Sequence, residues 1–311
     1  MTTSAKSPKS GSSGPKQSSQ QRLAAQRAEA ARARIAAEKR RRMLLMVGIP
    51  IAVVLVAIGV LVTVKLVSGS SAKSGVKSTA ASDAVIHDVT AVPSSVLDTV
   101  GVGTAKTLPK SVSAPALTDG GKPRVVYIGA EYCPFCAAER WGMVVALSRF
   151  GTFAGLGQTA SSPSDVYPST PTLTFHGSTF TSSTVAFTGQ ELQSNQVVNG
   201  QYAALDTPSA ADKALVSTYD APPYFAQSGS IPFVDIGGKY LISGASYDPS
   251  VLQGKTHAQI AAALSDPTSP IAKAVDGTAN LITAAICKTT ANAPAAVCSS
   301  AGVQAAAAVL K

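Results

Sequence analysis

A run of 22 residues without a single charge, Met43 to Val64, sets the strongest limit on how this chain can be arranged. At a rise of 1.5 Å per residue, a helix of this length spans about 33 Å, and the hydrocarbon core of a bilayer is roughly 30 Å thick. Four consecutive cations, Lys39 to Arg42, precede the run, and only Lys65 lies close behind it. The sequence therefore predicts one transmembrane helix over residues 43–66, with the lipid bilayer as its partner.

The distribution of charge predicts the orientation of this helix. Residues 1–42 hold eleven Lys and Arg against two Glu, which accounts for the whole net charge of +9. By the positive-inside rule the N-terminus is cytoplasmic and the rest of the chain lies outside a cell membrane that it crosses once. A cleaved signal peptide is the alternative, but its leader and apolar region would both be shorter. The remaining residues balance to zero charge, which argues against a nucleic-acid-binding domain.

The composition of the other segments predicts the domain plan. Within residues 1–42, the first 20 hold almost no apolar side chains and should be disordered, and residues 20–42, where Ala, Arg, Gln and Glu prevail, should be helical. Residues 67–84 are rich in Ser, Gly, Ala and Lys and are expected to be a flexible tether. Folded patterning begins near Val85, so residues 85–311 are expected to form one extracytoplasmic domain.

The motif Cys133-Pro134-Phe135-Cys136 falls where a strand is expected to meet a helix. Residues 125–128 are β-branched or aromatic, and apolar residues recur at helical spacing from 137 to 147. The start of a helix presents unpaired N–H groups and partial positive charge, which stabilise a thiolate. Pro134 suits the first helical position. We therefore expect Cys133 to be the exposed nucleophile and Cys136 the resolving thiol, with Phe135 exposed to substrate.

This strand, motif and helix resemble the active site of the thioredoxin superfamily. The segment Ile231-Pro232-Phe-Val-Asp-Ile-Gly-Gly-Lys-Tyr-Leu-Ile242 resembles the cis-proline loop and the following hairpin of that fold. The resemblance implies that Pro232 is cis and packed against Cys133, and that the backbone of Ile231 pairs with a substrate peptide. It implies an α/β, thioredoxin-like fold, here with an insert at about 152–220. Within that insert residues 172–176 and 184–188 have strand character and 210–219 helical character.

One position departs from the thioredoxin pattern. Many thioredoxins carry a buried acid six residues before the first cysteine, where this chain has Tyr127. Glu131 and Glu139 are candidate replacements as proton acceptors, but charged side chains are usually solvated, and we expect both to be exposed. Trp141 is expected in the core.

A longer run is similar to a membrane-anchored family catalogued as domain of unknown function 929. The resemblance rests on Tyr127-Ile-Gly-Ala-Glu-Tyr-Cys-Pro-Phe-Cys-Ala-Ala-Glu-Arg-Trp141, Leu147-Ser-Arg-Phe-Gly151 and Tyr167-Pro-Ser-Thr-Pro-Thr-Leu-Thr-Phe175. It covers most of residues 85–300, implies a thioredoxin-like fold and supplies no substrate.

Cys287 and Cys298 lie between two Ala-rich helical stretches in a C-terminal helical hairpin at about 268–311. Outside the membrane an even number of cysteines favours disulfides, so we expect a structural bridge here. Zinc is disfavoured because ten residues separate the pair, whereas zinc ligands usually stand two to four residues apart. The histidines at 87, 176 and 257 are scattered, and we expect neither a metal nor a cofactor.

These patterns predict a thiol–disulfide oxidoreductase that acts on protein thiols and disulfides, with a membrane redox partner to restore it. The direction of electron flow depends on the reduction potential and stays open at this point. The alternative is a non-catalytic binding or assembly module in which Cys133 and Cys136 form a permanent disulfide. A thiol peroxidase is a third, less favoured interpretation.

Overall fold

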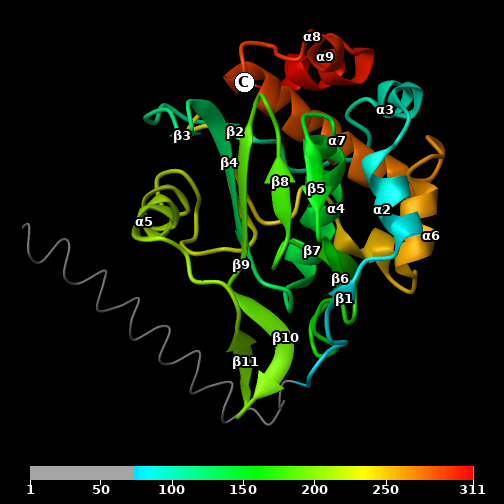
Figure 1. Ribbon diagram of the computed structural model, residues 1–311, viewed down its shortest axis with the longest axis vertical. Coiled ribbons are helices and arrows are strands. Elements are labelled where there is room, and N and C mark those ends of the chain that lie inside the picture. The colour runs from blue at the N-terminus through cyan, green and yellow to red at the C-terminus, as the bar shows by residue number, and fades with distance from the viewer. Residues whose placement is uncertain (1–72, 311) are drawn as a thin grey trace, which may run out of the picture. The chain divides into compact units, whose positions relative to one another are not determined.

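Residues 73–310 are described by a computed structural model, and they form a mixed α/β structure (Figure 1). The predicted tail at 1–42 and transmembrane helix at 43–66 lie outside these residues. Within 73–310, none of the helices is both long and apolar enough to cross a membrane.

The described chain alternates helices with many short strands. The strands are β1 (Thr79–Ala80), β2 (Lys110–Ser111), β3 (Thr118–Asp119), β4 (Lys122–Gly129), β5 (Thr152–Ala154), β6 (Gly157–Ala160), β7 (Pro171–Thr174), β8 (Thr179–Thr181), β9 (Ala186–Glu191), β10 (Gln193–Val198), β11 (Gln201–Ala204), β12 (Phe233–Ile236) and β13 (Tyr240–Ser243). The helices are α2 (Asp83–Thr90), α3 (Ser94–Val100), α4 (Pro134–Ser148), α5 (Ala210–Tyr219), α6 (His257–Ala263), α7 (Pro270–Thr289), α8 (Ala295–Cys298) and α9 (Ala301–Val309), with a 3₁₀ turn, η1, at Pro249–Leu252.

The main sheet is built around β4. Strand β12 pairs antiparallel with one edge of β4 and with β13 beyond it, while β9 pairs parallel with the other edge. Successive side chains of a strand point to opposite faces. Val125 and Tyr127 accordingly belong to the core formed with α4 and α7, and Val126 and Ile128 to a smaller cluster that includes residues of α5. Helices thus cover both faces of β4, which explains its continuous apolar run.

Residues 152–220, expected as an insert, are only partly outside the main sheet. Strand β9 pairs with β4 from Arg124↔Ala186 to Gly129↔Glu191, and α5 covers one face of the sheet. The sequence did not predict that β9 joins the main sheet, because β9 is half-buried and carries polar residues. It therefore lacks the apolar run that is typical of a central strand. The segments that do stand apart are the pairs β5–β8 and β6–β7 and the projecting hairpin β10–β11 (Figure 1).

The described part of the expected tether, residues 73–84, is not a flexible linker. The Gly75 N–H donates to the Asn195 carbonyl oxygen (2.8 Å), and the Asn195 side-chain amide donates to the Val76 carbonyl oxygen (2.7 Å). Strand β1 pairs with β6, and α2 begins at Asp83. Small residues allow this close packing, since a Cβ on Gly75 would lie 2.8 Å from the Asn195 side chain. A Ser- and Gly-rich composition therefore misled the prediction.

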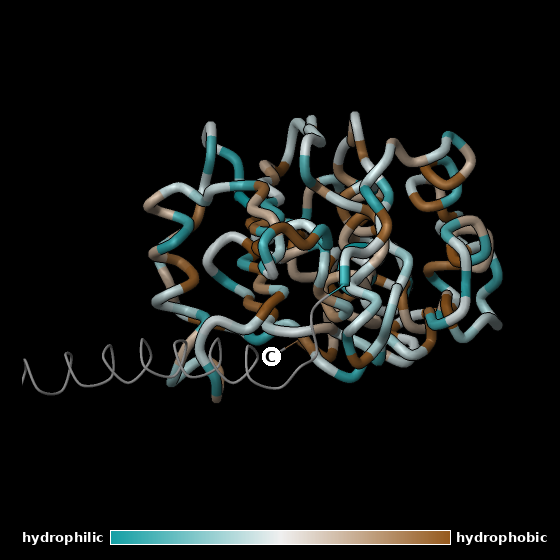
Figure 2. Tube along the Cα trace, turned by 90° about the horizontal axis from the view of Figure 1, so that it is seen from below, coloured by the Kyte–Doolittle hydropathy of each residue, from teal (hydrophilic) through white to brown (hydrophobic). Residues whose placement is uncertain are grey.

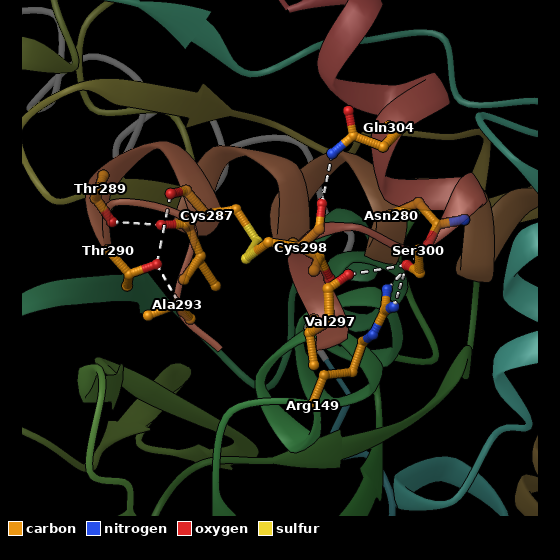
Figure 3. The surroundings of a disulfide bond; sticks show 12 residues. Arg149, Asn280, Cys287, Thr289, Thr290, Ala293, Val297, Cys298, Ser300 and Gln304 are labelled. Carbon is orange, nitrogen blue, oxygen red and sulfur yellow. Dashed lines mark hydrogen bonds between the residues drawn. A yellow bond between two sulfur atoms is a disulfide. The ribbon is translucent and has the colours of Figure 1, made fainter. Parts of the chain in front are cut away.

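Helix α7 packs against α4 on one face of the main sheet, and α9 packs against α7. Helices α4 and α7 approach closely, because a Cβ on Gly142 would lie only 2.8 Å from Thr278. Arg149 at the end of α4 donates to the Asn280 side chain of α7 (3.1 Å) and to the Ser300 hydroxyl at the start of α9 (2.9 Å; Figure 3). Figure 2 shows that apolar and hydrophilic residues alternate in short stretches along the described chain. A central apolar core therefore lies between the sheet and α4 and α7, and α9 extends it by packing against α7.

Candidate active site

Cys133 and Cys136 lie where β4 passes into α4. Cys133 is the N-cap of α4, and Pro134 is its first residue, as the sequence predicts. The Cys136 N–H donates to the Cys133 Sγ atom (3.3 Å), so one otherwise unpaired N–H of the helix start is directed at that sulfur. The expectation that Cys133 is exposed is wrong: it is buried, with 5% of its surface exposed, because the loop at Ile231 packs against it, and Cys136 is fully buried. Cys133 is therefore the sulfur that solvent or a substrate reaches first.

The two thiols differ in acidity. The pKa of Cys133 is lowered by hydrogen bonds from the Cys136 side chain and backbone, which outweigh the effect of burial, and by the positive charge of Arg140. The pKa of Cys136 is raised well above its ordinary value by burial and by its hydrogen bond to Cys133. Of the two thiols, Cys133 therefore loses its proton more readily, and Cys136 holds its proton more tightly.

The loop before β12 brings Ile231 and Pro232 to the same place. The Cys133 thiol donates to the Ile231 carbonyl oxygen (3.7 Å), although the two residues are 98 positions apart. The Ile231–Pro232 peptide bond is cis, and the Pro232 carbonyl oxygen accepts a hydrogen bond from Gly244 (2.8 Å). The hairpin of β12 and β13 follows directly, and both turn glycines, Gly237 and Gly238, have positive φ. The structure thus joins the motif and the proline loop in one site.

A surface groove of about 560 Å³ lies beside the Cys-Pro-Phe-Cys motif and the loop at Ile231. Its wall includes Ile231 and Phe135, and Phe135 is 38% exposed. The Phe135 ring meets that of Tyr167 edge-on, with centroids 5.8 Å apart. Tyr167, Tyr247 and Asp248 also line the groove. None of these three residues was predicted from the sequence to belong to a site, although Tyr167 begins one of the segments that carried the family resemblance.

The acids considered as proton acceptors are both buried, which corrects the expectation that they are solvated. Glu131 is 1% exposed and accepts a hydrogen bond from the Ser78 hydroxyl (2.7 Å). Glu139 is fully buried and accepts from the Ser246 N–H (2.8 Å) and hydroxyl (3.0 Å). Burial raises the pKa of Glu139 to about 7. The prediction failed because these partners come from segments far along the chain.

Behind the dithiol lies a buried ion pair that sequence analysis did not find. Arg140 of α4 donates from Nε to Glu191 Oε1 and from Nη2 to Glu191 Oε2, each at 2.7 Å, and both side chains are 0% exposed. Tyr127 packs beside it, with its ring centroid 5.9 Å from the guanidinium carbon. A charged residue in the pattern Cys-Ala-Ala-Glu-Arg-Trp gives no sign that it is buried, because its partner stands 51 residues away.

A family model described as Domain of unknown function (DUF929) matches residues 109–206 and 202–288. The chain belongs to this family. The matched residues include β4, the Cys-Pro-Phe-Cys motif, α4, β9 and the hairpin of β12 and β13. No curated protein and no solved structure matches the chain significantly.

The other residues that the sequence singled out in this DUF929 protein contribute to the fold and lie outside the dithiol site. Cys287 and Cys298 form a disulfide, with Cα atoms 5.7 Å apart, between α7 and α8 (Figure 3). Trp141 is fully buried and donates to the Pro171 carbonyl oxygen (3.0 Å), so it is a core residue. His257 contacts the backbone of β6 and β7. Among residues 73–310, no three potential ligand side chains gather as a metal site would require.

Proposed function

We propose that this DUF929 protein is a membrane-anchored thiol–disulfide oxidoreductase with a thioredoxin-like fold. One observation carries the proposal: the Cys133 sulfur stands at the start of α4, 3.7 Å from the carbonyl oxygen that precedes Pro232. The strand order β13–β12–β4–β9, in which β12 alone runs antiparallel to β4, supports the thioredoxin-like assignment. The apolar run at 43–66 and its preceding cations support a single-pass protein of the cell membrane whose domain at 85–311 is extracytoplasmic.

The proposed reaction begins on the more acidic sulfur. The Cys133 thiolate attacks one sulfur of a substrate disulfide, and a Cys133–substrate bond forms. The substrate's own disulfide bond breaks, and its second sulfur leaves as a thiolate that takes up a proton. Cys136 then loses its proton and attacks the Cys133 sulfur, which releases the first substrate sulfur as a thiol. Two electrons and two protons thereby pass from the dithiol to the substrate.

The reaction also runs in reverse, when a substrate dithiol attacks an oxidised Cys133–Cys136 pair. In either direction the pair must be restored after one turnover, and we assign this to a second dithiol–disulfide couple on a membrane partner. The substrates are protein thiols or disulfides, and the groove lined by Phe135, Tyr167 and Ile231 offers them an apolar surface next to Cys133.

The test uses full-length protein in detergent micelles. We expect catalysed reduction of insulin by dithiothreitol, complete loss of it in Cys133→Ser, and a trapped mixed disulfide in Cys136→Ser. The control variant Cys287→Ser/Cys298→Ser should keep the activity, because that pair lies outside the site. We also expect one thiol to react with an alkylating agent below about pH 7.

Two outcomes would contradict the proposal. A Cys133–Cys136 disulfide that resists millimolar dithiothreitol while the fold stays native would support a binding or assembly module. Consumption of hydrogen peroxide without insulin reduction would indicate a thiol peroxidase. The membrane topology has its own test, in which a membrane-impermeant maleimide labels Cys133 in intact, reduced cells. Labelling that occurs only after lysis would contradict the proposed orientation.

A further inference from the structure

The ion pair between Arg140 and Glu191 is the least exposed pair of opposite charges in the described chain. Both side chains are 0% exposed, whereas the other strongly buried pair, Arg124 with Asp212, is 16% and 2% exposed. Removing two charges from water costs several kcal/mol each, and apolar residues of similar volume often stabilise a fold equally well or better. Stability by itself therefore does not explain why a charged pair occupies this position.

Hydrogen bonds connect Arg140 to the backbone that holds Cys133. The Ala130 carbonyl oxygen accepts from Arg140 Nη2 (2.6 Å) and also from the Cys133 N–H (3.2 Å). The guanidinium also lies near Thr172 Oγ1 (3.4 Å), and that hydroxyl donates to the Ala137 carbonyl oxygen in the first turns of α4 (2.9 Å). Arg140 thus ties together the loop before the motif and the helix after it.

Glu191 holds the guanidinium in this orientation. Its two carboxylate oxygens bind Arg140 in a bidentate arrangement, which fixes the plane of the guanidinium as well as its position. Glu191 is the last residue of β9, opposite Gly129 of β4, so the pairing of these two strands brings it under the motif.

We propose that Arg140, oriented by Glu191, is a positioning residue for the dithiol. Its guanidinium fixes the turn from Ala130 to Cys133 and supplies positive charge to the Cys133 thiolate, and Glu191 limits the strength of that charge. This inference rests on the proposed oxidoreductase function. The positive charge of Arg140 lowers the pKa of both thiols, whereas the negative charge of Glu191 raises the pKa of Cys136, which agrees with opposite roles for the pair.

The test measures the alkylation rate of Cys133 against pH in full-length, reduced protein, with the labelled peptide identified by mass spectrometry. Glu191→Gln leaves the positive charge without its counter-charge, so the midpoint of the profile should move to lower pH. Arg140→Met/Glu191→Met removes both charges at similar volume, so the midpoint should move to higher pH. Each shift should be about one pH unit, with a roughly tenfold change in the equilibrium constant for oxidation by glutathione.

The opposite signs separate an electrostatic role from a purely structural one. A structural role would move both midpoints in the same direction or in neither, and either result would overturn the proposal. Arg140→Lys keeps the charge without the bidentate geometry and serves if the double variant does not fold; its midpoint should stay below that of a matched Arg140→Gln variant. Arg124→Met, which breaks the other ion pair, should leave the midpoint unchanged.

This readout is independent of the activity assay. If the variants show the opposite shifts but wild-type protein reduces no insulin, the proposed function is refuted and the electrostatic role of Arg140 stands. If wild-type protein reduces insulin but the variants do not show the opposite shifts, the electrostatic role is refuted and the proposed function stands.

Discussion

Asp276 gives the sharpest test of the physical reasoning, because it is a buried acid without a partner. It lies on α7, is fully buried, and neither of its carboxylate oxygens has a hydrogen-bond partner within residues 73–310. Burial raises its pKa from 3.8 to about 8. The side chain is thus expected to be protonated in the folded protein at pH 7 and ionised in the unfolded chain.

The sign of the pH dependence follows from proton binding. Between pH 3.8 and pH 8 the folded state holds a proton on Asp276 that the unfolded state has lost, so the free energy of unfolding falls as pH rises. One pKa unit corresponds to about 1.4 kcal/mol, so the total loss through this group is about 6 kcal/mol. With a folded pKa of about 8, about 1.4 kcal/mol of that loss falls between pH 7 and pH 9.

The assay is urea unfolding of wild type and Asp276→Asn, followed by circular dichroism at pH 7, 8 and 9. The Asn side chain does not titrate, so the difference in unfolding free energy, variant minus wild type, should grow by about 1.4 kcal/mol over this range. Glu139→Gln is the matched control: with a folded pKa of about 7, its difference should grow by only about 0.4 kcal/mol. A difference for Asp276→Asn that stays constant from pH 7 to pH 9 would refute the reasoning.

Two further predictions concern stability. Cys287→Ser/Cys298→Ser opens a loop of 12 residues and should lower the unfolding free energy by about 3 kcal/mol; dithiothreitol should lower that of the wild type similarly, and an unchanged urea midpoint would show that the bridge is not structural. Gly103→Ala should lower the melting temperature, because φ is +51° and the new Cβ would lie 1.9 Å from the Lys273 carbonyl oxygen. Gly120→Ala, at a φ of +54° with nothing within 4 Å, should lower it far less, and equal losses would contradict the clash.

Sequence patterns were sufficient for elements whose structure depends on near neighbours. The strand at 125–128, the helix that begins after Cys133, the Gly-Gly hairpin and the helix at 210–219 all match the structure. Turn glycines, a proline at the first helical position and the spacing of apolar residues act over a few residues, so they can be read locally. The same is true of the family relationship, because it rests on three short runs of residues at and after the motif.

Only the tertiary structure decided the environment of the charged residues and the place of the half-polar strand. Glu139, Arg140 and Asp276 carry ordinary charged side chains in the sequence, and each is fully buried by segments from elsewhere in the chain. Strand β9 belongs to the main sheet because it pairs with β4. Residues 73–84 are held in place by hydrogen bonds to β6 and β10. The sequence by itself determined where the two sulfurs stand on a helix. Long-range contacts decided which charges surround them, because the free energy of a buried charge depends on its neighbours in space.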